Sequence, residues 1–305
     1  FGYDNFHPTQ EKAIKSVLTG KDTFVLMPTG GGKSICYQIP ALILDGVTIV
    51  VSPLIALMKD QVDNLEKSNI TDAVTINGLL DPIERAKAFE RVENGSASIL
   101  YISPESLRSK SIERLLLGRN VVRFVIDEAH CFSSWGQDFR VDYLYIGDFI
   151  KFLQVKKNLE NGIPVSCFTA TAKQNVIQDI KEYFMNKLSI QLEIFSSKTS
   201  RTNLTYKVFP KENEEDKYNT LRNLLDGKQC PTIIYTSRTK KAYQIAERLS
   251  VDGYLAKPYH GKMDKKEKSE NQDAFVCGEI DIIVATSAFG MGVDISDVLA
   301  IYHHA

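Results

Sequence analysis

The chain has 305 residues, of which 43% are hydrophobic and 25% are charged, and its formal net charge is −1. This composition is typical of a globular protein long enough for two domains, and it excludes the disordered and fibrous classes. The longest apolar runs, residues 39–44 and 47–51, are far shorter than the roughly 18 residues that cross a bilayer, so we expect no contact with a membrane. Because the net charge is close to zero, any contact with nucleic acid has to come from a local group of basic and amide side chains.

The five cysteines are widely spaced, at positions 36, 131, 167, 230 and 277. Their odd number and the lack of a Cys-x-x-Cys pair argue against a disulfide framework and against a structural zinc site. We therefore expect an intracellular protein in a reducing compartment, the cytoplasm of a bacterium or the nucleus of a eukaryote. Cys36 and Cys167 lie within apolar patterns and are predicted core residues. Since the chain begins with Phe1, we also expect that its start has been trimmed.

Short β-branched segments alternate with amphipathic segments in the first two thirds of the chain. The predicted strands are residues 23–27, 47–52, 98–103, 121–126 and 165–169. The first helical face consists of Ala13, Ile14, Val17 and Leu18, and it ends at Gly20, a residue suited to a left-handed C-terminal cap. This alternation predicts a doubly wound α/β domain, in which helices cover both faces of a parallel sheet.

A second α/β series follows after about residue 200. Its predicted strands are residues 232–236, 280–286 and 298–303, and residues 240–249 are a predicted helix. The polar stretch 196–203 is rich in turn-forming residues and is the predicted linker, which gives domains of residues 1–197 and 198–305. The acidic run 211–217 predicts the solvated start of a helix, in preference to a binding tail.

A candidate phosphate loop follows the first predicted strand directly. It consists of Met27, Pro28, Thr29, Gly30, Gly31, Gly32, Lys33 and Ser34. The three glycines let backbone amides approach an anion, and the start of the next helix adds a favourable dipole. Lys33 is predicted to reach the β and γ phosphates of a nucleotide, and Ser34 to bind Mg²⁺. The match is partial because Met27 stands where the strict pattern has glycine; a glycine-rich turn with an exposed lysine is the alternative.

Two carboxylates, Asp127 and Glu128, follow the predicted strand 121–126. A carboxylate at this place can hold magnesium through water, and its neighbour can polarise the water that attacks a γ-phosphate. We therefore predict that Asp127 binds the metal and that Glu128 acts as the general base. A solvated strand end with two acidic residues is the alternative interpretation.

Trp135, Phe139 and Arg140 follow these carboxylates closely, and Trp135 is the only tryptophan of the chain. Aromatic rings stack on bases and arginine binds phosphates, so this segment predicts a contact with nucleic acid close to the site of hydrolysis. A packing role in the core is the alternative for Trp135.

Residues 127–130 resemble the Asp-Glu-Ala-His box of superfamily 2 helicases, and their continuation resembles the RecQ family of DNA helicases. Further similar motifs occur in family order at residues 1–10, 52–61, 101–105, 168–172, 233–238, 259–261 and 285–294. The resemblance implies two tandem RecA-like domains and an ATP-dependent helicase that moves 3′-to-5′ on single-stranded DNA and unwinds forked or duplex DNA. An RNA-remodelling ATPase of the same superfamily and a catalytically silent, ATP-gated DNA-binding module are the alternatives.

The resemblance also implies roles for residues around the nucleotide. Tyr3 is expected to stack near adenine and Gln10 to bind the edge of that base, whereas His7 stands where the family usually has an arginine against the nucleotide. Asp294 is expected to contact the ribose from the second domain.

A further implication concerns the coupling of hydrolysis to DNA. His130 and residues 169–171 are expected to transmit the state of the nucleotide to the aromatic-rich segment, which contains Trp135, Phe139 and Arg140 and senses single-stranded DNA. The chain ends before the helical motif that carries the family's arginine finger, so we expect a second domain that is incomplete at its C-terminus and slow hydrolysis.

Overall fold

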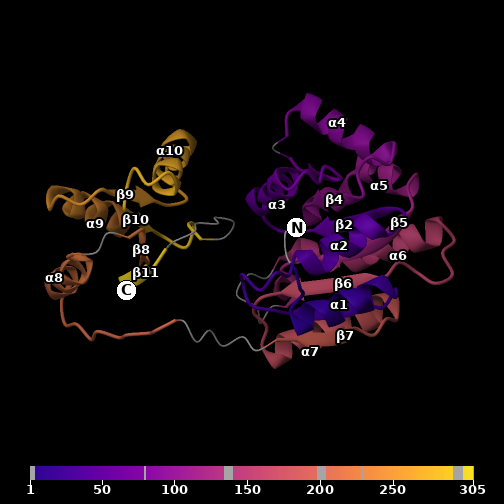
Figure 1. The fold of residues 1–305 in the computed structure, drawn as a ribbon, viewed down its shortest axis with the longest axis horizontal. Coiled ribbons are helices and arrows are strands. Elements are labelled where there is room, and N and C mark those ends of the chain that lie inside the picture. Colours follow the sequence, from indigo (N-terminus) through magenta and orange to yellow (C-terminus); the bar gives the residue numbers. More distant parts are fainter. Residues whose placement is uncertain are drawn as a thin grey trace. The chain divides into compact units, whose positions relative to one another are not determined.

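The computed structural model describes residues 4–78, 80–133, 140–197, 204–227, 230–290 and 298–304, and of Lys265 only the backbone (Figure 1). The chain divides into two compact units, Phe1–Arg201 and Thr202–Ala305. Each unit has a parallel sheet and core clusters of its own. The predicted domain boundary after residue 197 stays a prediction, because residues 198–203 lie outside the described part of the chain.

The first unit has a seven-stranded sheet in the order β3-β4-β2-β5-β6-β1-β7, and each described strand pair in it is parallel. The strands are β1 (Thr23–Leu26), β2 (Val47–Val51), β3 (Ala73–Ile76), β4 (Ile99–Ile102), β5 (Val121–Ile126), β6 (Val165–Thr169) and β7 (Glu193–Ser196). β5 and β6 have the predicted bounds, whereas β1, β2 and β4 are shorter by one residue at one or both ends. The edge strands β3 and β7 were not predicted.

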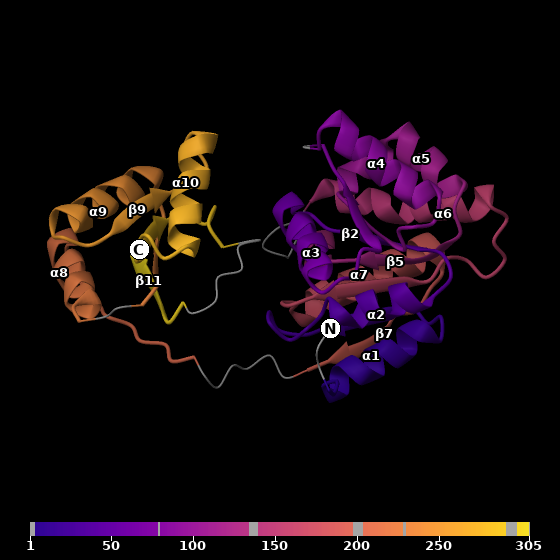
Figure 2. The same cartoon turned by 45° about the horizontal axis from the view of Figure 1, so that its top comes forward.

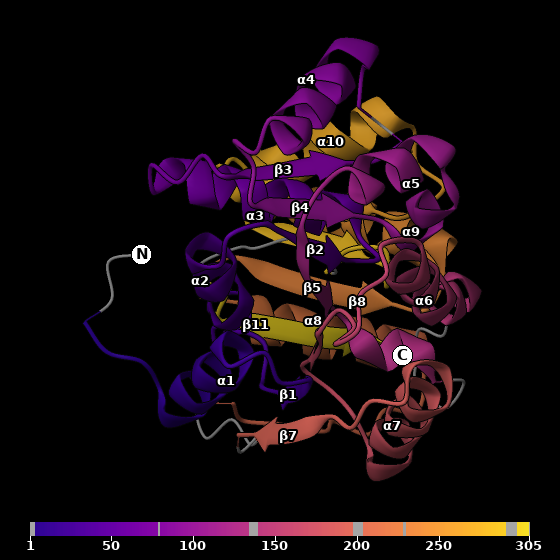
Figure 3. The ribbon, with the colours of Figure 1, turned by 90° about the vertical axis from the view of Figure 1, so that its right-hand side faces the viewer.

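Helices cover both faces of this sheet, as Figures 2 and 3 show. The helices are α1 (Pro8–Leu18), α2 (Ile35–Ile43), α3 (Ile55–Lys67), α4 (Pro82–Glu93), α5 (Lys110–Leu117), α6 (Ile146–Lys156) and α7 (Gln174–Leu188). Short 3-10 helices are η1 (Pro104–Arg108), η2 (Ala129–Phe132) and η3 (Val141–Tyr145). Gly20, just beyond α1, has the predicted left-handed backbone, with φ of 78°.

Two separate core clusters confirm the doubly wound arrangement. Helices α1, α2 and α3 contribute to one cluster, and helices α4 to α7 to the other. Neighbouring residues of one strand enter opposite clusters, as Phe24 and Val25 of β1 do, because side chains of a strand alternate between its faces. Cys36 and Cys167 are fully buried, as predicted, and all five cysteines are free.

The second unit has a four-stranded parallel sheet in the order β11-β8-β10-β9. Its elements are α8 (Glu214–Leu225), β8 (Thr232–Thr236), α9 (Thr239–Val251), β9 (Ala256–Tyr259), α10 (Lys265–Val276), β10 (Ile282–Ala285) and β11 (Ala300–His304). The acidic run does begin a helix, α8, where the side chain of Asn213 accepts a hydrogen bond of 2.8 Å from the amide of Asp216. Within the described ranges, no helix combines the length and the apolar character that a bilayer crossing requires.

Arg123, within β5, is 1% exposed and joins three neighbouring parts of the first unit. Its guanidinium donates to the main-chain oxygens of Val17 (2.6 Å) and Lys21 (2.9 Å), and to the hydroxyl of Ser166 (2.9 Å). Burial lowers the pKa of the guanidinium to about 10, so the side chain stays charged at neutral pH. The strand that leads to Asp127 is therefore tied to α1, to the loop before β1 and to β6.

Arg123→Ala is expected to lower the free energy of unfolding by about 3 kcal/mol or more, because it leaves buried acceptors without a donor and opens a cavity. Urea unfolding followed by circular dichroism measures the change. Arg114→Ala on α5 is the matched control, since Arg114 is exposed and its loss should alter stability by no more than about 0.5 kcal/mol. Equal midpoints for the two variants would contradict the structural role of Arg123.

Candidate active site

Three adjacent strands, β5, β6 and β1, end at the same edge of the first sheet. The phosphate loop follows β1, Asp127 follows β5, and Thr169 is the last residue of β6. The backbone amide of Met27 donates to the oxygen of Thr169 at 3.1 Å, which holds the start of the loop beside β6. The carboxyl ends of parallel strands are the usual place for a ligand in such sheets.

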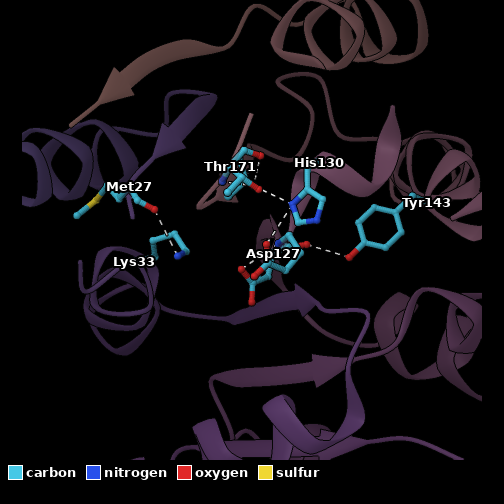
Figure 4. Close-up of polar contacts among 8 residues, drawn as sticks. Met27, Lys33, Asp127, His130, Tyr143 and Thr171 are labelled. Atoms are coloured by element: carbon cyan, nitrogen blue, oxygen red, sulfur yellow. Dashed lines mark hydrogen bonds and ion pairs between the residues drawn. The ribbon is translucent and has the colours of Figure 1, made fainter. Parts of the chain in front are cut away.

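The phosphate loop depends on its glycines. Gly30 and Gly32 have φ angles of 76° and 74°, in the left-handed region that side chains disfavour. A Cβ atom on Gly32 would lie 2.2 Å from Nε2 of Gln10, so any other residue there would also displace the Gln10 side chain. The ammonium group of Lys33 donates to the oxygen of Met27 at 3.4 Å (Figure 4). Ser34 stands at the start of α2.

Gln10 ties the first turn of α1 to this loop. It is 5% exposed, and its amide nitrogen lies 3.3 Å from the oxygen of Gly31 and 3.4 Å from that of Gly32. Its amide oxygen accepts from the backbone of His7 at 2.8 Å. Both ends of the Gln10 amide thus have partners within the protein, so its binding to adenine stays a prediction. His7 is exposed, and Tyr3 lies outside the described residues.

Asp127 is 8% exposed at the end of β5. Burial and the negative charge of Glu128 raise the pKa of Asp127 to about 7, against the opposing effects of the Glu128 amide, Lys33 and His130. Glu128 has a left-handed backbone, with φ of 48°, which is uncommon for a residue other than glycine. Its amide donates to the Asp127 carboxylate at 3.0 Å. The two carboxylates therefore share a tight turn that ends β5.

His130 joins Glu128 to β6. Its Nδ1 atom lies 3.2 Å from a carboxylate oxygen of Glu128 and 2.9 Å from the hydroxyl oxygen of Thr169 (Figure 4). The Thr169 hydroxyl donates to the oxygen of Thr171 at 3.1 Å, so Nδ1 is the donor toward Thr169. Burial alone would lower the pKa of His130, but Cys131 and Glu128 favour the charged imidazole and raise it to about 10. Glu128, His130, Thr169 and Thr171 thus form a continuous polar chain.

Tyr143 supports the turn from the other side, a role that the sequence did not predict. Its hydroxyl donates to the main-chain oxygen of Asp127 at 2.9 Å (Figure 4). Its ring packs against that of Phe132, with 5.2 Å between the ring centroids. Phe132 in turn contacts Tyr183 and Phe184 of α7 at 4.7 and 5.2 Å between ring centroids. The turn at Asp127 is therefore hydrogen-bonded to Tyr143, which belongs to an aromatic cluster with Phe132, Tyr183 and Phe184.

Of the predicted DNA-contact residues, only Arg140 lies within the described part of the chain; Trp135 and Phe139 are outside it, as is Asp294. The guanidinium of Arg140 donates to the oxygen of Pro53 at 3.0 Å, in the loop that follows β2. The backbone amide of Arg140 donates to the oxygen of Cys131, also at 3.0 Å. Arg140 thus lies near the predicted catalytic residues and contacts the motif at 52–61.

Two family models match the chain. The DEAD/DEAH box helicase model matches residues 7–180, and the helicase conserved C-terminal domain model matches residues 216–304.

Relatives over the full chain confirm the predicted similarity to RecQ helicases. The ATP-dependent DNA helicase RecQ of Bacillus subtilis is 41% identical over 309 residues, an alignment that covers 99% of this chain and 49% of that protein. The putative ATP-dependent DNA helicase Q1 of Caenorhabditis briggsae is 38% identical, with 100% and 49% covered. The probable ATP-dependent DNA helicase RecS of B. subtilis is 37% identical, with 99% and 59% covered. The chain thus spans about half the length of these relatives.

Solved structures share the fold. Mss116p bound to single-stranded RNA and AMP-PNP matches with a TM-score of 0.79 and 19% identity, covering 99% of this chain and 64% of that one. The Mycobacterium smegmatis helicase Lhr bound to single-stranded DNA and AMP-PNP matches with a TM-score of 0.72 and 19% identity, covering 99% and 42%. Together with the two parallel sheets, these matches confirm the predicted α/β fold of two RecA-like domains.

Tyr143→Phe is expected to lower the free energy of unfolding by about 1–3 kcal/mol, because the buried oxygen of Asp127 loses its donor while the ring is retained. Urea unfolding measures the loss. Tyr145→Phe, on the same 3-10 helix, is the control that keeps the Tyr143 bond. If both variants unfold at the wild-type midpoint, the hydroxyl of Tyr143 does not stabilise the turn.

Proposed function

Since the chain belongs to the DEAD/DEAH box helicase family, we propose that it is the ATP-driven motor of a DNA helicase. The motor couples hydrolysis of ATP to movement along single-stranded DNA, 3′-to-5′ as the RecQ resemblance implies, and separates forked or duplex DNA. The observation that carries the proposal is the polar chain from Glu128 through His130 to Thr169, because Thr169 is hydrogen-bonded to Met27 at the start of the phosphate loop.

The two units have different roles in this proposal. Residues 1–197 form the ATP-binding domain and residues 198–305 the helicase C-terminal domain, an assignment supported by the positions of the two family matches. Tyr3, His7 and Gln10 of the first domain and Asp294 of the second are proposed to contact the nucleotide.

The phosphate loop binds the β and γ phosphates of ATP. The amides of Gly30 and Gly32 and the start of α2 favour an anion, whereas the amide of Gly31 donates to the oxygen of Pro28 at 2.9 Å. The contact of Lys33 with the Met27 oxygen is long, at 3.4 Å, and a phosphate oxygen is a better partner because a charge-assisted hydrogen bond is stronger. When ATP binds, the ammonium group of Lys33 therefore moves from the Met27 oxygen to the phosphates.

Ser34 and Asp127 fit a magnesium ion. A hydroxyl and a carboxylate are the oxygen donors that Mg²⁺ prefers, and substrate phosphates usually complete its coordination. Burial disfavours the charged form of Asp127, and a cation would stabilise it. When bound, the ion neutralises phosphate charge and orients the phosphates for displacement. Among the described residues, no three His, Cys, Asp or Glu side chains gather into a metal site.

Glu128 is proposed as the general base and His130 as the residue that orients it. The left-handed backbone sets the direction of the Glu128 side chain, and Nδ1 of His130 holds one carboxylate oxygen at 3.2 Å. The other oxygen is then directed to an attacking water. Because His130 also donates to Thr169, a movement of β6 reaches Glu128 through one hydrogen bond and one ion pair.

DNA is proposed to bind at Trp135, Phe139 and Arg140. A base stacked on an aromatic ring contributes about 1–3 kcal/mol, enough to favour one arrangement of the segment over another. The contact of Arg140 with Pro53 supports this proposal, because it joins the segment to the motif that the RecQ resemblance assigns to DNA.

Glu128→Gln is expected to retain ATP binding and to lower turnover about 10²- to 10⁴-fold, because the amide cannot accept the proton of the attacking water. Steady-state hydrolysis and equilibrium binding of a fluorescent ATP analogue measure the two effects. Glu113→Gln on α5, a partly buried residue paired with Lys110, is the control. An unchanged hydrolysis rate in Glu128→Gln would remove this residue from the mechanism.

Hydrolysis of ATP by this chain is expected to rise with single-stranded DNA and to rise less with single-stranded RNA. The assay compares no nucleic acid, DNA and RNA of the same sequence, with Lys33→Ala as the inactive control. Stimulation by RNA alone would indicate an RNA-remodelling ATPase. Binding of ATP and DNA with no hydrolysis above the Lys33→Ala background would indicate a silent DNA-binding module.

A further inference from the structure

Ser133 and Arg140 are the described residues that border Trp135 and Phe139 in the chain, and different elements hold them. Ser133 is 1% exposed and donates its hydroxyl to a carboxylate oxygen of Asp179 at 2.5 Å. The guanidinium of Arg140 donates to the oxygen of Pro53, and its backbone amide donates to the oxygen of Cys131. Asp179 belongs to α7, and nothing in the motifs of the sequence indicated a role for it.

Two side-chain hydrogen bonds join the same two stretches of chain. One stretch runs from Asp127 to Ser133, and the other from Thr169 into α7. The first bond, between His130 and Thr169 at 2.9 Å, lies at the candidate active site. The second, between Ser133 and Asp179, lies at the base of the aromatic-rich segment. A displacement of one stretch against the other therefore has to change both bonds.

The hydrogen bond between Ser133 and Asp179 is strong, and neighbouring contacts help it to hold Ser133 on α7. A hydroxyl bound to a carboxylate is charge-assisted and stronger than a bond between neutral groups. Ser133 is buried, so water has little access to compete for its hydroxyl. The contacts of Phe132 with Tyr183 and Phe184 hold η2 on α7 next to this bond. Ser133, the last described residue before the aromatic-rich segment, is thus fixed to α7.

We propose that Asp179 is a positioning residue that couples the aromatic-rich segment to the site of hydrolysis. Through Ser133 it keeps the segment in register with the His130–Thr169 bond, so that DNA bound at the segment changes the orientation of Glu128. Asp179 touches neither nucleotide nor DNA in this role. The inference rests on the proposed function, because it needs DNA to stimulate hydrolysis.

The test measures ATP hydrolysis by this chain with and without saturating single-stranded DNA. Asp179→Ala and Ser133→Ala are each expected to lower the ratio of stimulated to basal rate about 5-fold or more, the size of a typical coupling between two sites, and to leave the basal rate unchanged. The double variant should lose no more than either single one, since both remove the same bond. Asp179→Asn, which keeps an acceptor oxygen, should recover part of the ratio.

Glu182→Ala is the matched control, because it removes the same charge from the same helix and its partner, Gln178, also lies on α7. Its ratio should equal that of the wild type. Ser133→Ala removes a single oxygen atom and should disturb the fold less than Asp179→Ala. It therefore tests the inference even if Asp179→Ala fails to fold. An undiminished ratio in Ser133→Ala, or an equal loss in Glu182→Ala, overturns the inference. Absence of DNA stimulation in the wild-type chain contradicts the proposed function and the inference with it.

Discussion

The hydrogen bond between His130 and Thr169 joins the ends of two neighbouring parallel strands, and the arrangement of the candidate site depends on it. The sheet brings Asp127 and Thr169 to one edge, but it does not set the direction of the side chains beyond the strands. The shared Nδ1 atom of His130 does so for Glu128. Because unsatisfied polar groups in a buried cluster are costly, each bond of this chain favours the others. The proposed motor needs such a cluster, since a change at one end then reaches the other.

Local patterns predicted the fold class, which the structure confirms, and the two motifs of the candidate active site. The runs 121–126 and 165–169 consist mostly of buried β-branched and aromatic residues, which is typical of central strands of a parallel sheet. The candidate phosphate loop could be recognised in the sequence because its backbone conformation requires glycine at positions 30 and 32. In each case neighbours in the sequence are neighbours in the structure, so the pattern needs no tertiary information.

The strands that were missed, β3, β7 and β9, share a physical cause. Each has four residues, lies at the edge of its sheet and is not buried along its whole length, so a strand pattern is harder to recognise there. β9 also contains Pro258, which is tolerated at an edge and argues against a strand in the sequence. Tyr143 and Asp179 were missed because their partners, Asp127 and Ser133, lie 16 and 46 residues away. Only the packing of η3 and α7 brings these pairs together.

The left-handed backbone of Glu128 has an evolutionary consequence. A non-glycine residue in this conformation costs about 1–2 kcal/mol, and glycine would avoid the strain. Selection for thermal stability alone would therefore remove the carboxylate that the proposed chemistry needs. A search for stabilising substitutions in this chain will therefore favour changes at position 128 that abolish function. Position 128 should be kept as glutamate when the chain is engineered for stability.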